Sequence, residues 1–217
     1  MGRSGCSCRN LRHPARLVVL TGGPGAGKTA VLEVVRRSFC RHVLVLPESA
    51  GILFGGGFPR HATPSGHRAV QRGVFHVQRQ LERLAIEEAE AGLILCDRGT
   101  LDGYAYWPPP REDYWSEVGT THSAELARYS AVIHLRTPTS PDAYGRDNPL
   151  RIESLEEAAV IDARIAEYWG KHPHQYVVPS TTDFLTKAAR ALAILREQVP
   201  ECCRHHVKPF LWDHIHE

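Results

Sequence analysis

The chain has 217 residues, of which 42% are hydrophobic and 23% charged, and its formal net charge at pH 7 is +2. This length and composition are those of one ordinary globular domain. The small net charge argues against a nucleic-acid-binding protein, because such proteins usually carry a concentrated basic face. No stretch of the sequence approaches the apolar length of a membrane span.

The amino-terminal segment, residues 1–16, is basic and precedes the first acidic residue, Glu33. Its arginines are Arg3, Arg9, Arg12 and Arg16. We interpret this segment as a mobile basic tail, and it contains no apolar stretch long enough for a secretory signal. An arginine-rich start without acids is also compatible with an organelle transit peptide, but the expected location is cytoplasmic.

Six cysteines occur in the sequence, and two of them, Cys202 and Cys203, are adjacent. Adjacent cysteines do not suggest a secreted disulfide framework, so we expect reduced thiols. The run CCRHH at 202–206, followed by His214 and His216, matches no usual spacing of zinc ligands. We therefore interpret residues 199–217 as a histidine-rich C-terminal extension.

Short unbroken apolar runs alternate with longer segments of helical periodicity. The runs at 17–20, 43–46, 93–96, 131–135 and 176–178 predict strands that are buried on both faces, as in parallel sheets covered by helices. Helices are predicted over about 67–91, 153–170 and 182–198, and in the first of them Val70, Val74, Val77, Leu81 and Leu84 form a stripe expected to face the core. The alternation predicts one α/β domain with a doubly wound parallel sheet over residues 17–198.

In such sheets ligands bind beyond the carboxyl ends of the strands, and the sequence GGPGAGKT follows the first predicted strand. It satisfies the pattern G-x-x-x-x-G-K-[ST] and lies between a strand and a helix, as a phosphate-binding loop requires. Glycines let backbone N–H groups surround anionic oxygens, and the helix N-terminus adds positive potential. The residues expected to contact a nucleoside triphosphate are Gly22, Gly23, Pro24, Gly25, Ala26, Gly27, Lys28, Thr29 and Ala30.

Within this loop we expect Lys28 to reach the β- and γ-phosphates and Thr29 to bind Mg²⁺. A guanine-specific Asn-Lys-x-Asp motif is missing from the sequence, and TKAA at 186–189 lacks the final acid. ATP is therefore the expected nucleotide, with its base near residues 179–183.

The residues after the third predicted strand separate a transferase from a hydrolytic motor. Asp97 ends that strand and is placed to hold Mg²⁺ directly or through water. AAA-type motors generally follow this acid with a glutamate that activates water, whereas here Arg98 follows, which cannot act as a base at neutral pH. Such motors also carry a helical lid domain, for which no residues remain, so a motor is disfavoured.

Glu48 follows the second predicted strand and would point toward a phosphoryl acceptor. A carboxylate at hydrogen-bond distance from a hydroxyl can position it and accept its proton, although a solvated loop glutamate is the alternative. Arg98 is expected to clamp the acceptor or the transferring phosphate, because a planar guanidinium suits oxyanions. The alternative for Arg98 is a surface salt bridge.

Three arginines frame a stretch rich in proline, glycine and aspartate after the fourth predicted strand, namely Arg136, Arg146 and Arg151. Phosphoryl transfer depends on neutralising charge and excluding water. We therefore expect a small lid here that brings Arg146 and Arg151 over the β- and γ-phosphates.

Together these residues resemble the P-loop nucleoside and nucleotide kinase superfamily. Within it the chain looks most similar to a branch of small AAA-annotated ATP/GTP-binding proteins related to the ribosylnicotinamide kinase domain of the NadR type. The resemblance is carried by LTGGPGAGKT (20–29), LPES (46–49), DRGTLDGYAYW (97–107), DNPLRIESLEEAAVIDARI (147–165), WGKHPHQYVV (169–178) and TDFLTKAARAL (182–192). It covers about residues 16–198 and implies a P-loop kinase fold with strand order 2-3-1-4-5.

The resemblance also implies roles for single residues. Lys28 and Thr29 take the phosphate and magnesium roles, Glu48 and Asp97 face the reaction centre, and Arg151 belongs to the lid. His172 of the KHP sequence matches a marker of the same branch, and we expect it to have a structural role at a helix end.

These observations predict a Mg²⁺- and ATP-dependent phosphotransferase acting on a small hydroxyl-bearing metabolite, nucleoside-like or other. Its expected catalytic residues are Lys28, Glu48, Asp97, Arg98, Arg146 and Arg151. One alternative is a nucleotide-dependent switch that turns over ATP or GTP slowly and binds a protein or lipid partner. Another is a polynucleotide kinase, which shares the catalytic parts but needs a broader basic track than the sequence contains.

Overall fold

The computed structural model describes residues 13–88, 90–139, 154–180 and 183–204. The strands are β1 (Arg16–Thr21), β2 (Val43–Leu46), β3 (Leu93–Asp97), β4 (Ala131–Leu135) and β5 (Gln175–Val178). The helices are α1 (Lys28–Ser38), α2 (Ser49–Gly55), α3 (Pro64–Glu88), α4 (Asp102–Tyr106), α5 (Tyr114–Glu117), α6 (His122–Leu126), α7 (Leu155–Trp169), α8 (Phe184–Gln198) and α9 (Glu201–Arg204).

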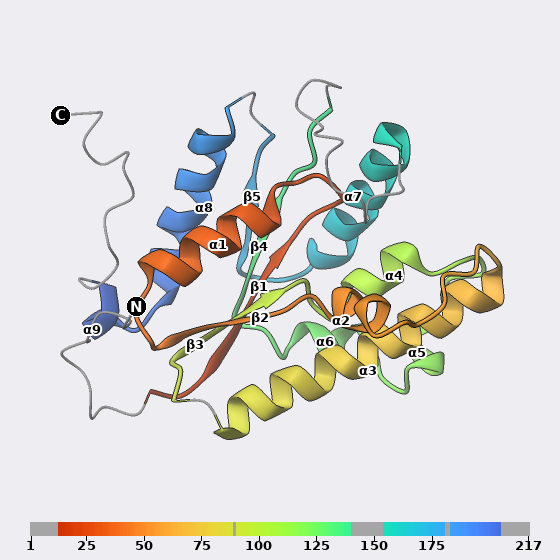
Figure 1. Cartoon of the computed structure of the whole chain (residues 1–217), viewed down its shortest axis with the longest axis horizontal. Coiled ribbons are helices and arrows are strands. Elements are labelled where there is room, and N and C mark those ends of the chain that lie inside the picture. Colours follow the sequence, from red (N-terminus) through yellow and green to blue (C-terminus); the bar gives the residue numbers. More distant parts are fainter. Residues whose placement is uncertain (1–12, 89, 140–153, 181–182, 205–217) are drawn as a thin grey trace.

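In the described part of the chain, the strands form a five-stranded parallel sheet in the order β2-β3-β1-β4-β5 (Figure 1). β1 is central, and its Leu20 pairs with Asp97 of β3 and with Ile133 of β4. This arrangement confirms the predicted α/β class and the predicted strand order. Each apolar run of the sequence forms a strand at the position where it was expected.

Helices cover both faces of the sheet. On one face α1 and α8 lie side by side (Figure 1) and pack against strand residues that include Val18 and Leu95. On the other face α3, α4 and α7 pack against Val19 and Ile94. Because successive strand side chains point to opposite faces, both faces of each strand must be apolar, which gives the unbroken runs.

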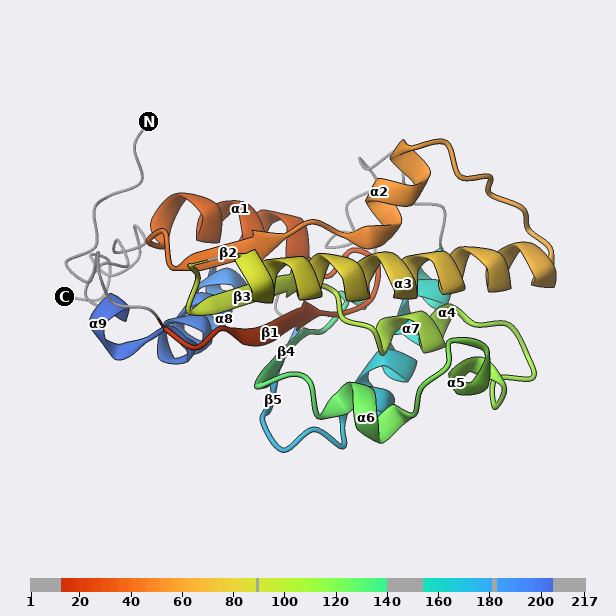
Figure 2. The ribbon, with the colours of Figure 1, turned by 90° about the horizontal axis from the view of Figure 1, so that it is seen from below.

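The long helix α3 reaches past the sheet and lies beside α2 and α4 (Figure 2). Its buried face matches only part of the predicted stripe: Val70 is 7% exposed and Leu81 packs against the core, but other residues are buried as well. Leu84 at the end of the expected apolar stripe is 52% exposed, whereas Gln78 and Glu82 are 2% and 0% exposed. The buried side of α3 packs partly through hydrogen-bonded polar groups, and a count of hydrophobic periodicity gives such groups no weight.

Helix α2 was not among the predicted helices. The helix is short, and its buried residue is Ser49. The Ser49 hydroxyl donates a hydrogen bond to Gln78 of α3 at 2.6 Å. A tertiary contact therefore fixes α2, and this contact leaves no periodic pattern in the sequence.

The buried core continues past the last predicted helix. Val199 and Cys203 are 1% and 0% exposed and pack with the α1 and α8 side of the sheet. Arg146 and Arg151 lie outside the described residues, as do positions 1–12 and 205–217. Within the described ranges, no helix combines the length and the apolar character needed to cross a membrane.

Candidate active site

The phosphate loop joins β1 to α1. Gly25 and Gly27 have φ angles of 75° and 89°, a left-handed conformation that glycine adopts without strain. A Cβ atom on Gly27 would also lie 2.7 Å from the ring of Phe184. The glycines of the motif therefore permit both the bend and the close packing of α8 against it. The loop ends at Lys28, where α1 directs its N-terminus toward the same space.

A buried carboxylate on α7 holds the loop from behind. Asp162 is 2% exposed, and its Oδ1 accepts a hydrogen bond from the N–H of Gly23 at 2.9 Å. His134 of β4 contacts the same oxygen at 2.8 Å, and Arg136 contacts Oδ2 at 2.9 Å. The N–H of Gly23 therefore points away from the phosphate position, and Arg136 is already paired.

Lys28 folds back over the loop. Its ammonium group donates hydrogen bonds to the carbonyl oxygens of Gly22 and Gly23, at 2.8 and 3.0 Å. Burial, followed by the positive charge of Arg98, lowers the pKa of Lys28 to about 7. An anionic ligand at the loop would favour the charged form of this lysine.

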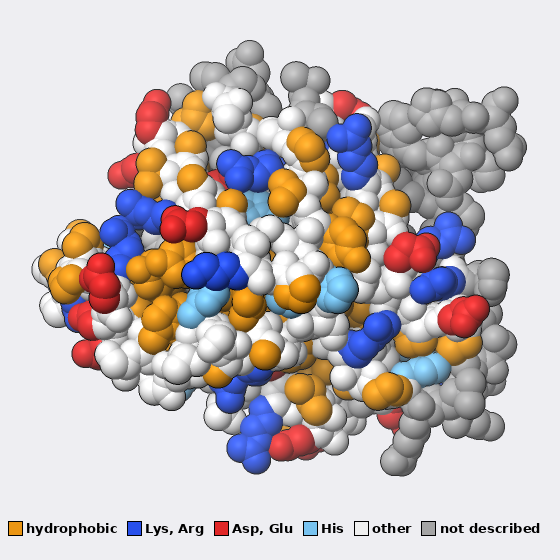
Figure 3. Space-filling model, turned by 180° about the vertical axis from the view of Figure 1, so that it is seen from behind, with side chains coloured by type: hydrophobic (Ala, Val, Ile, Leu, Met, Phe, Trp, Pro, Cys, Tyr) orange, Lys and Arg blue, Asp and Glu red, His pale blue; other side chains and the backbone are white. Residues whose placement is uncertain are grey.

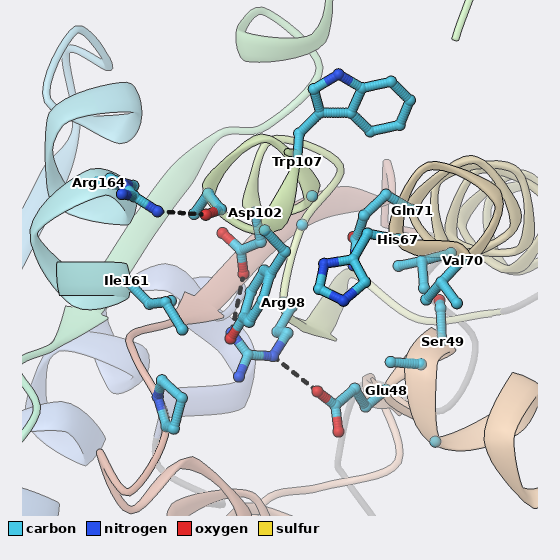
Figure 4. Close-up of a pocket in the computed structure, with 18 of the residues that line it drawn as sticks. Glu48, Ser49, His67, Val70, Gln71, Arg98, Asp102, Trp107, Ile161 and Arg164 are labelled. Atoms are coloured by element: carbon cyan, nitrogen blue, oxygen red, sulfur yellow. Dashed lines mark hydrogen bonds and ion pairs between the residues drawn. The ribbon is translucent and has the colours of Figure 1, made fainter. Parts of the chain in front are cut away.

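Glu48 and Arg98 form an ion pair across the space in front of the loop (Figure 4). Nε of Arg98 donates to Oε1 of Glu48 at 2.7 Å. Burial opposes ionisation of Glu48, but the charges of Arg98 and Lys28 outweigh it and lower the pKa of Glu48. The side chain of Glu48 is 39% exposed and that of Arg98 15%. Glu48 is thus an ionised carboxylate that is open on one side.

Arg98 has a φ angle of 68°, which is uncommon for a residue other than glycine. Its backbone N–H donates to the carbonyl of Leu20, and its Nη1 donates to the carbonyl of Gly22, both at 3.1 Å. Such backbone conformations cost about 1–3 kcal/mol and persist where the surroundings fix them, often at functional sites. The strain places the guanidinium between the loop and Glu48.

Asp102, which the sequence analysis did not single out, supports Arg98 from the other side. The carboxylate of Asp102 is 3.7 Å from Nη1 of Arg98. It accepts hydrogen bonds from the hydroxyl of Thr21 at 2.8 Å and from the indole N–H of Trp169 at 2.6 Å. Asp102 is 3% exposed and lines the cavity beside Arg98, where it helps to position the guanidinium (Figure 4).

Asp97 and Thr29 supply oxygen atoms at the base of the site. Burial, followed by the negative charge of Glu48, raises the pKa of Asp97 from 3.8 to about 6. Thr29 is exposed at the start of α1, and both residues line the same cavity. Carboxylate and hydroxyl oxygens suit Mg²⁺, and a cation would favour the ionised form of Asp97. The residues present therefore fit a magnesium ion.

A buried polar network connects the two loops that carry Glu48 and Arg98. Ser49 binds Gln78, and the amide of Gln78 donates to Glu82 at 2.7 Å. Glu82 also accepts the hydroxyl proton of Tyr129 at 2.8 Å, and this hydroxyl accepts a hydrogen bond from the N–H of Thr100 at 3.0 Å. The network thus runs from the residue after Glu48 to within two residues of Arg98.

A cavity of about 1300 Å³ extends from the phosphate loop past Glu48 and Arg98 to a chamber between α3, α4 and α7. Figure 4 shows α7 residues Arg164 and Ile161 facing His67 and Gln71 of α3 across this space. Further aromatic side chains line the chamber, namely Phe54, Phe75, Tyr106, Trp107 and Tyr114. The cavity therefore has an anion-binding end and an aromatic end.

Most of the predicted site residues come together in this cavity. Its wall includes residues 24–30, Glu48, Asp97 and Arg98. Gly22 and Gly23 lie behind this wall, where their carbonyls bind Lys28. Phe184, beside the position expected for the nucleotide base, also lines the cavity.

His172 has the structural position that was expected for it. It follows the end of α7, where its N–H donates to the carbonyl of Trp169 at 2.8 Å. Its Nε2 lies 2.8 Å from the carbonyl oxygen of Tyr129. His172 is 6% exposed and connects two segments of the fold on the side of the sheet away from the cavity wall.

Sequence reasoning missed the residues that α3 and α7 contribute, chiefly Gln71, Phe75, Asp162 and Arg164. Asp162 and Arg164 lie in the stretch VIDARI, where helical periodicity was read as core packing alone. The sequence contains no signal for Gln71 and Phe75, because they reach the cavity only through the path that α3 takes past the carboxyl ends of the strands.

The fold and this cavity define the class of protein: it has a P-loop kinase fold, in which the ligand cavity lies at the carboxyl edge of a 2-3-1-4-5 sheet. Two solved structures of deoxyadenosine kinase from M. mycoides share the fold at 17% sequence identity and a TM-score of 0.57. One has dCMP and a flexible dCDP bound, and the other dATP. The alignments cover 83% of this chain and 99% and 98% of the kinase chains.

The family model described as an AAA domain, AAA_28, matches residues 17–187, and the chain belongs to this family. No curated protein matches the chain in sequence. The predicted P-loop kinase fold and the predicted relation to AAA-annotated proteins are confirmed. The narrower relation to the NadR-type branch stays a prediction.

Proposed function

We propose that the protein is a Mg²⁺- and ATP-dependent kinase that phosphorylates a small hydroxyl-bearing metabolite of nucleoside-like shape. The observation that carries this proposal is the continuity of the cavity. Its phosphate-binding end and its aromatic end open into each other, with the Glu48–Arg98 pair at the junction. Such an enclosure would hold a donor and an acceptor together, which is the main requirement of phosphoryl transfer.

At the phosphate end, Lys28 and the backbone N–H groups of the loop would bind the β- and γ-phosphates. Mg²⁺, held by Thr29 and Asp97, would neutralise charge on the triphosphate. Arg98 would direct its remaining donors at the transferring group. The predicted lid residues Arg146 and Arg151 remain candidates for the same role.

Glu48 would accept the proton of the acceptor hydroxyl. Arg98 engages Oε1 of this carboxylate, so Oε2 would be the oxygen that receives the proton. The lowered pKa of Glu48 keeps the group ionised at neutral pH, as a proton acceptor must be.

The chamber beyond Glu48 suits a planar heterocycle. Aromatic residues, among them Phe75 and Tyr106, line it, and the Gln71 amide can both donate and accept hydrogen bonds. The likeness to deoxyadenosine kinase, one structure of which has dATP bound, supports a nucleoside-like acceptor and an adenine nucleotide as ligand. The proposed location of the protein is the cytoplasm, as in the sequence analysis.

The face of the protein that Figure 3 shows argues against a polynucleotide acceptor. Basic and acidic side chains are interspersed among the described residues of this face, so it carries no continuous basic track (Figure 3). A nucleic acid strand would need such a track along its phosphates.

The proposal is tested by incubating the protein with Mg²⁺-ATP or Mg²⁺-GTP and a pooled library of nucleosides, nucleotides, sugars and amino alcohols. Mass spectrometry then searches for a species heavier by one phosphoryl group. We expect a nucleoside-like product, with ATP the better donor. Tight nucleotide binding with neither transfer nor appreciable turnover would contradict the proposal and support the nucleotide-dependent switch.

Two variants separate the roles of the residues. Lys28→Ala should abolish tight triphosphate binding, whereas Glu48→Gln should retain it and lower kcat by about 100-fold or more. Glu87→Gln on the exposed side of α3 is the matched control and should transfer at the wild-type rate. Normal turnover by Glu48→Gln would remove Glu48 from the mechanism.

A further inference from the structure

Thiol and imidazole groups from three distant parts of the chain meet at the amino-terminal edge of the sheet. His13 precedes β1, His42 precedes β2, and Cys202 and Cys203 lie in α9. Figure 2 shows α9 beside the start of β1. Strand starts and strand ends occupy opposite edges of a parallel sheet, so this cluster is remote from the nucleotide cavity.

The distances within the cluster match those of a metal site. Sγ of Cys203 lies 3.4 Å from Nδ1 of His42, and Sγ of Cys202 lies 3.4 Å from Nε2 of His13. The two sulfur atoms are 3.9 Å apart. A tetrahedral zinc ion, with bonds of about 2.3 Å to sulfur and about 2.05 Å to nitrogen, has sulfur–nitrogen edges of about 3.5 Å and sulfur–sulfur edges of about 3.8 Å.

Three of the groups already form a common ligand set. Among the described residues, the ligand atoms of His13, His42 and Cys203 all lie within 4.8 Å of one another. Cys202 lies outside this set of three, but its Sγ is close to Nε2 of His13 and to Sγ of Cys203, so a rotation of its side chain would bring it in as the fourth ligand. Cys40 lies next to the site, with its Sγ 4.0 Å from Nδ1 of His42.

Two of the ligands, His42 and Cys203, are held inside the protein, and the other two, His13 and Cys202, are partly exposed. His42 is 1% exposed and Cys203 0%. The carbonyl of His42 accepts hydrogen bonds from the N–H groups of Gly92 and Leu93, both at 3.0 Å. A Cβ atom on Gly92 would lie 2.8 Å from Cβ of His13, so glycine permits the close approach of His13. Structural zinc sites have four protein ligands.

We propose that the protein binds one zinc ion through His13, His42, Cys202 and Cys203. Sulfur and imidazole ligands favour zinc over magnesium, so this ion and the nucleotide's magnesium would occupy separate sites. The zinc ion would join the segment before β1 and the helix α9 to the start of β2. It would thereby fasten residues from both ends of the described chain to the sheet.

The test uses the full chain, treated with a chelator, desalted and titrated with zinc chloride. We expect about one equivalent of zinc per chain, measured by plasma mass spectrometry after a second desalting step. Cobalt chloride in place of zinc should give the visible absorption of tetrahedral cobalt and a thiolate-to-metal charge-transfer band. Absence of retained zinc in the wild-type protein would overturn the proposal.

Two ligand variants and two controls assign the site. His13→Gln, at a partly exposed position that leaves the core intact, and Cys203→Ala should each weaken zinc binding by at least about tenfold. His76→Gln removes an exposed histidine from α3 and should bind zinc like the wild type. The second control replaces Cys6 and Cys8 by serine and His205 and His206 by glutamine, and it should also retain zinc.

Every outcome decides the assignment. Loss of zinc in the ligand variants with retention in both controls supports the proposed site. Undiminished zinc binding by His13→Gln and Cys203→Ala, or equal loss in the second control, would show that other residues hold the metal. Circular dichroism of His13→Gln distinguishes a lost ligand from a lost fold.

Discussion

Lys28 is a cation in surroundings that disfavour positive charge. Burial and the charge of Arg98 lower its pKa to about 7, although Asp97 and Glu48 act in the opposite direction. A bound triphosphate would bring negative charge beside the ammonium group and raise this pKa again. Nucleotide binding and protonation of Lys28 are therefore linked.

We expect nucleotide binding above pH 7 to be accompanied by proton uptake at Lys28. From pH 7 to 9 the affinity for Mg²⁺-ATP should fall by up to about tenfold per pH unit, relative to Lys28→Arg, whose guanidinium stays charged. Calorimetry in buffers of different ionisation enthalpy measures the uptake. An absence of uptake by the wild type at pH 8 would contradict the linkage.

The pKa of Asp97 is shifted in the direction that disfavours its charged form, as for Lys28, but this shift is upward. Its pKa is raised from 3.8 to about 6, so the folded protein favours the protonated carboxyl group. The free energy of unfolding therefore decreases as pH rises from about 4 to about 6, and the full cost of the ionised group is present at pH 7. This cost is the price of keeping a carboxylate ready for a cation.

Asp97→Asn should remove that cost. We expect the free energy of unfolding of the nucleotide-free protein to increase by about 1–3 kcal/mol at pH 7, and by less at pH 5. Urea denaturation at both pH values measures the difference. Phosphoryl transfer should be lost in the same variant, and a stability gain that is equal at the two pH values would show that the cause is not ionisation.

Among the secondary-structure elements, α3 has the most unusual burial pattern. Its centre presents Gln78 and Glu82 to the interior, where Glu82 is bound by Arg128 at 2.5 Å and by Tyr129 at 2.8 Å. The buried carboxylate of Glu82 is tolerated because Gln78, Arg128 and Tyr129 all donate hydrogen bonds to it. This network acts together with the apolar contacts of α3, such as that of Ala85 with the sheet, to orient α3 against α6 and the loop that carries Arg98.

Removal of the central carboxylate should therefore be costly. We expect Glu82→Leu to lower the free energy of unfolding by about 3–5 kcal/mol. The variant removes one of the two buried carboxylates that pair with Arg128, the other being Glu125, and it leaves the Tyr129 hydroxyl without its acceptor. Glu87→Leu, one helical turn further along and paired with Arg83 on the exposed side, is the matched control. Similar unfolding midpoints in urea for the two variants would show that the network does not stabilise the fold.

Across the whole molecule, the two edges of the sheet carry different groups of polar residues. The carboxyl edge carries the cavity at the phosphate loop, and the amino-terminal edge carries the cluster of His13, His42 and the α9 cysteines. α3 and α7 extend the fold beyond the carboxyl edge and close the cavity on two sides. Ligand binding there should stabilise the entire domain, because the cavity wall is built from elements throughout the sequence.

Mg²⁺-ATP at a concentration 100 times its Kd should stabilise the fold by about 2.7 kcal/mol, which for a chain of this size corresponds to an increase in Tm of about 5–10 °C. Differential scanning fluorimetry measures this shift. The same concentration should leave the Tm of Lys28→Ala unchanged, and Mg²⁺-GTP should give a smaller shift in the wild type. Equal shifts with ATP and GTP would remove the expected preference for adenine.

Much of the architecture could be predicted because its signals are local. The unbroken apolar runs gave all five strands, and the Gly22–Thr29 motif located the phosphate loop between β1 and α1. Glu48 and Asp97 could be placed at one edge because parallel strands end on the same side. The prediction failed at α2 and along α3, where hydrogen bonds between distant residues replace periodic apolar contacts.

The fold class and the phosphate loop could be predicted from the sequence alone, because glycine spacing and apolar runs are signals within a few neighbouring residues. The strand order was predicted from the resemblance to P-loop kinases. The tertiary structure was needed to show that Arg98 pairs with Glu48, that Asp162 holds Gly23, and that α3 and α7 line the aromatic end of the cavity. It also brought His13 and His42 to Cys203, which lies 161 positions after His42. Such contacts depend on how the helices cross the sheet, and no spacing within a single segment records that geometry.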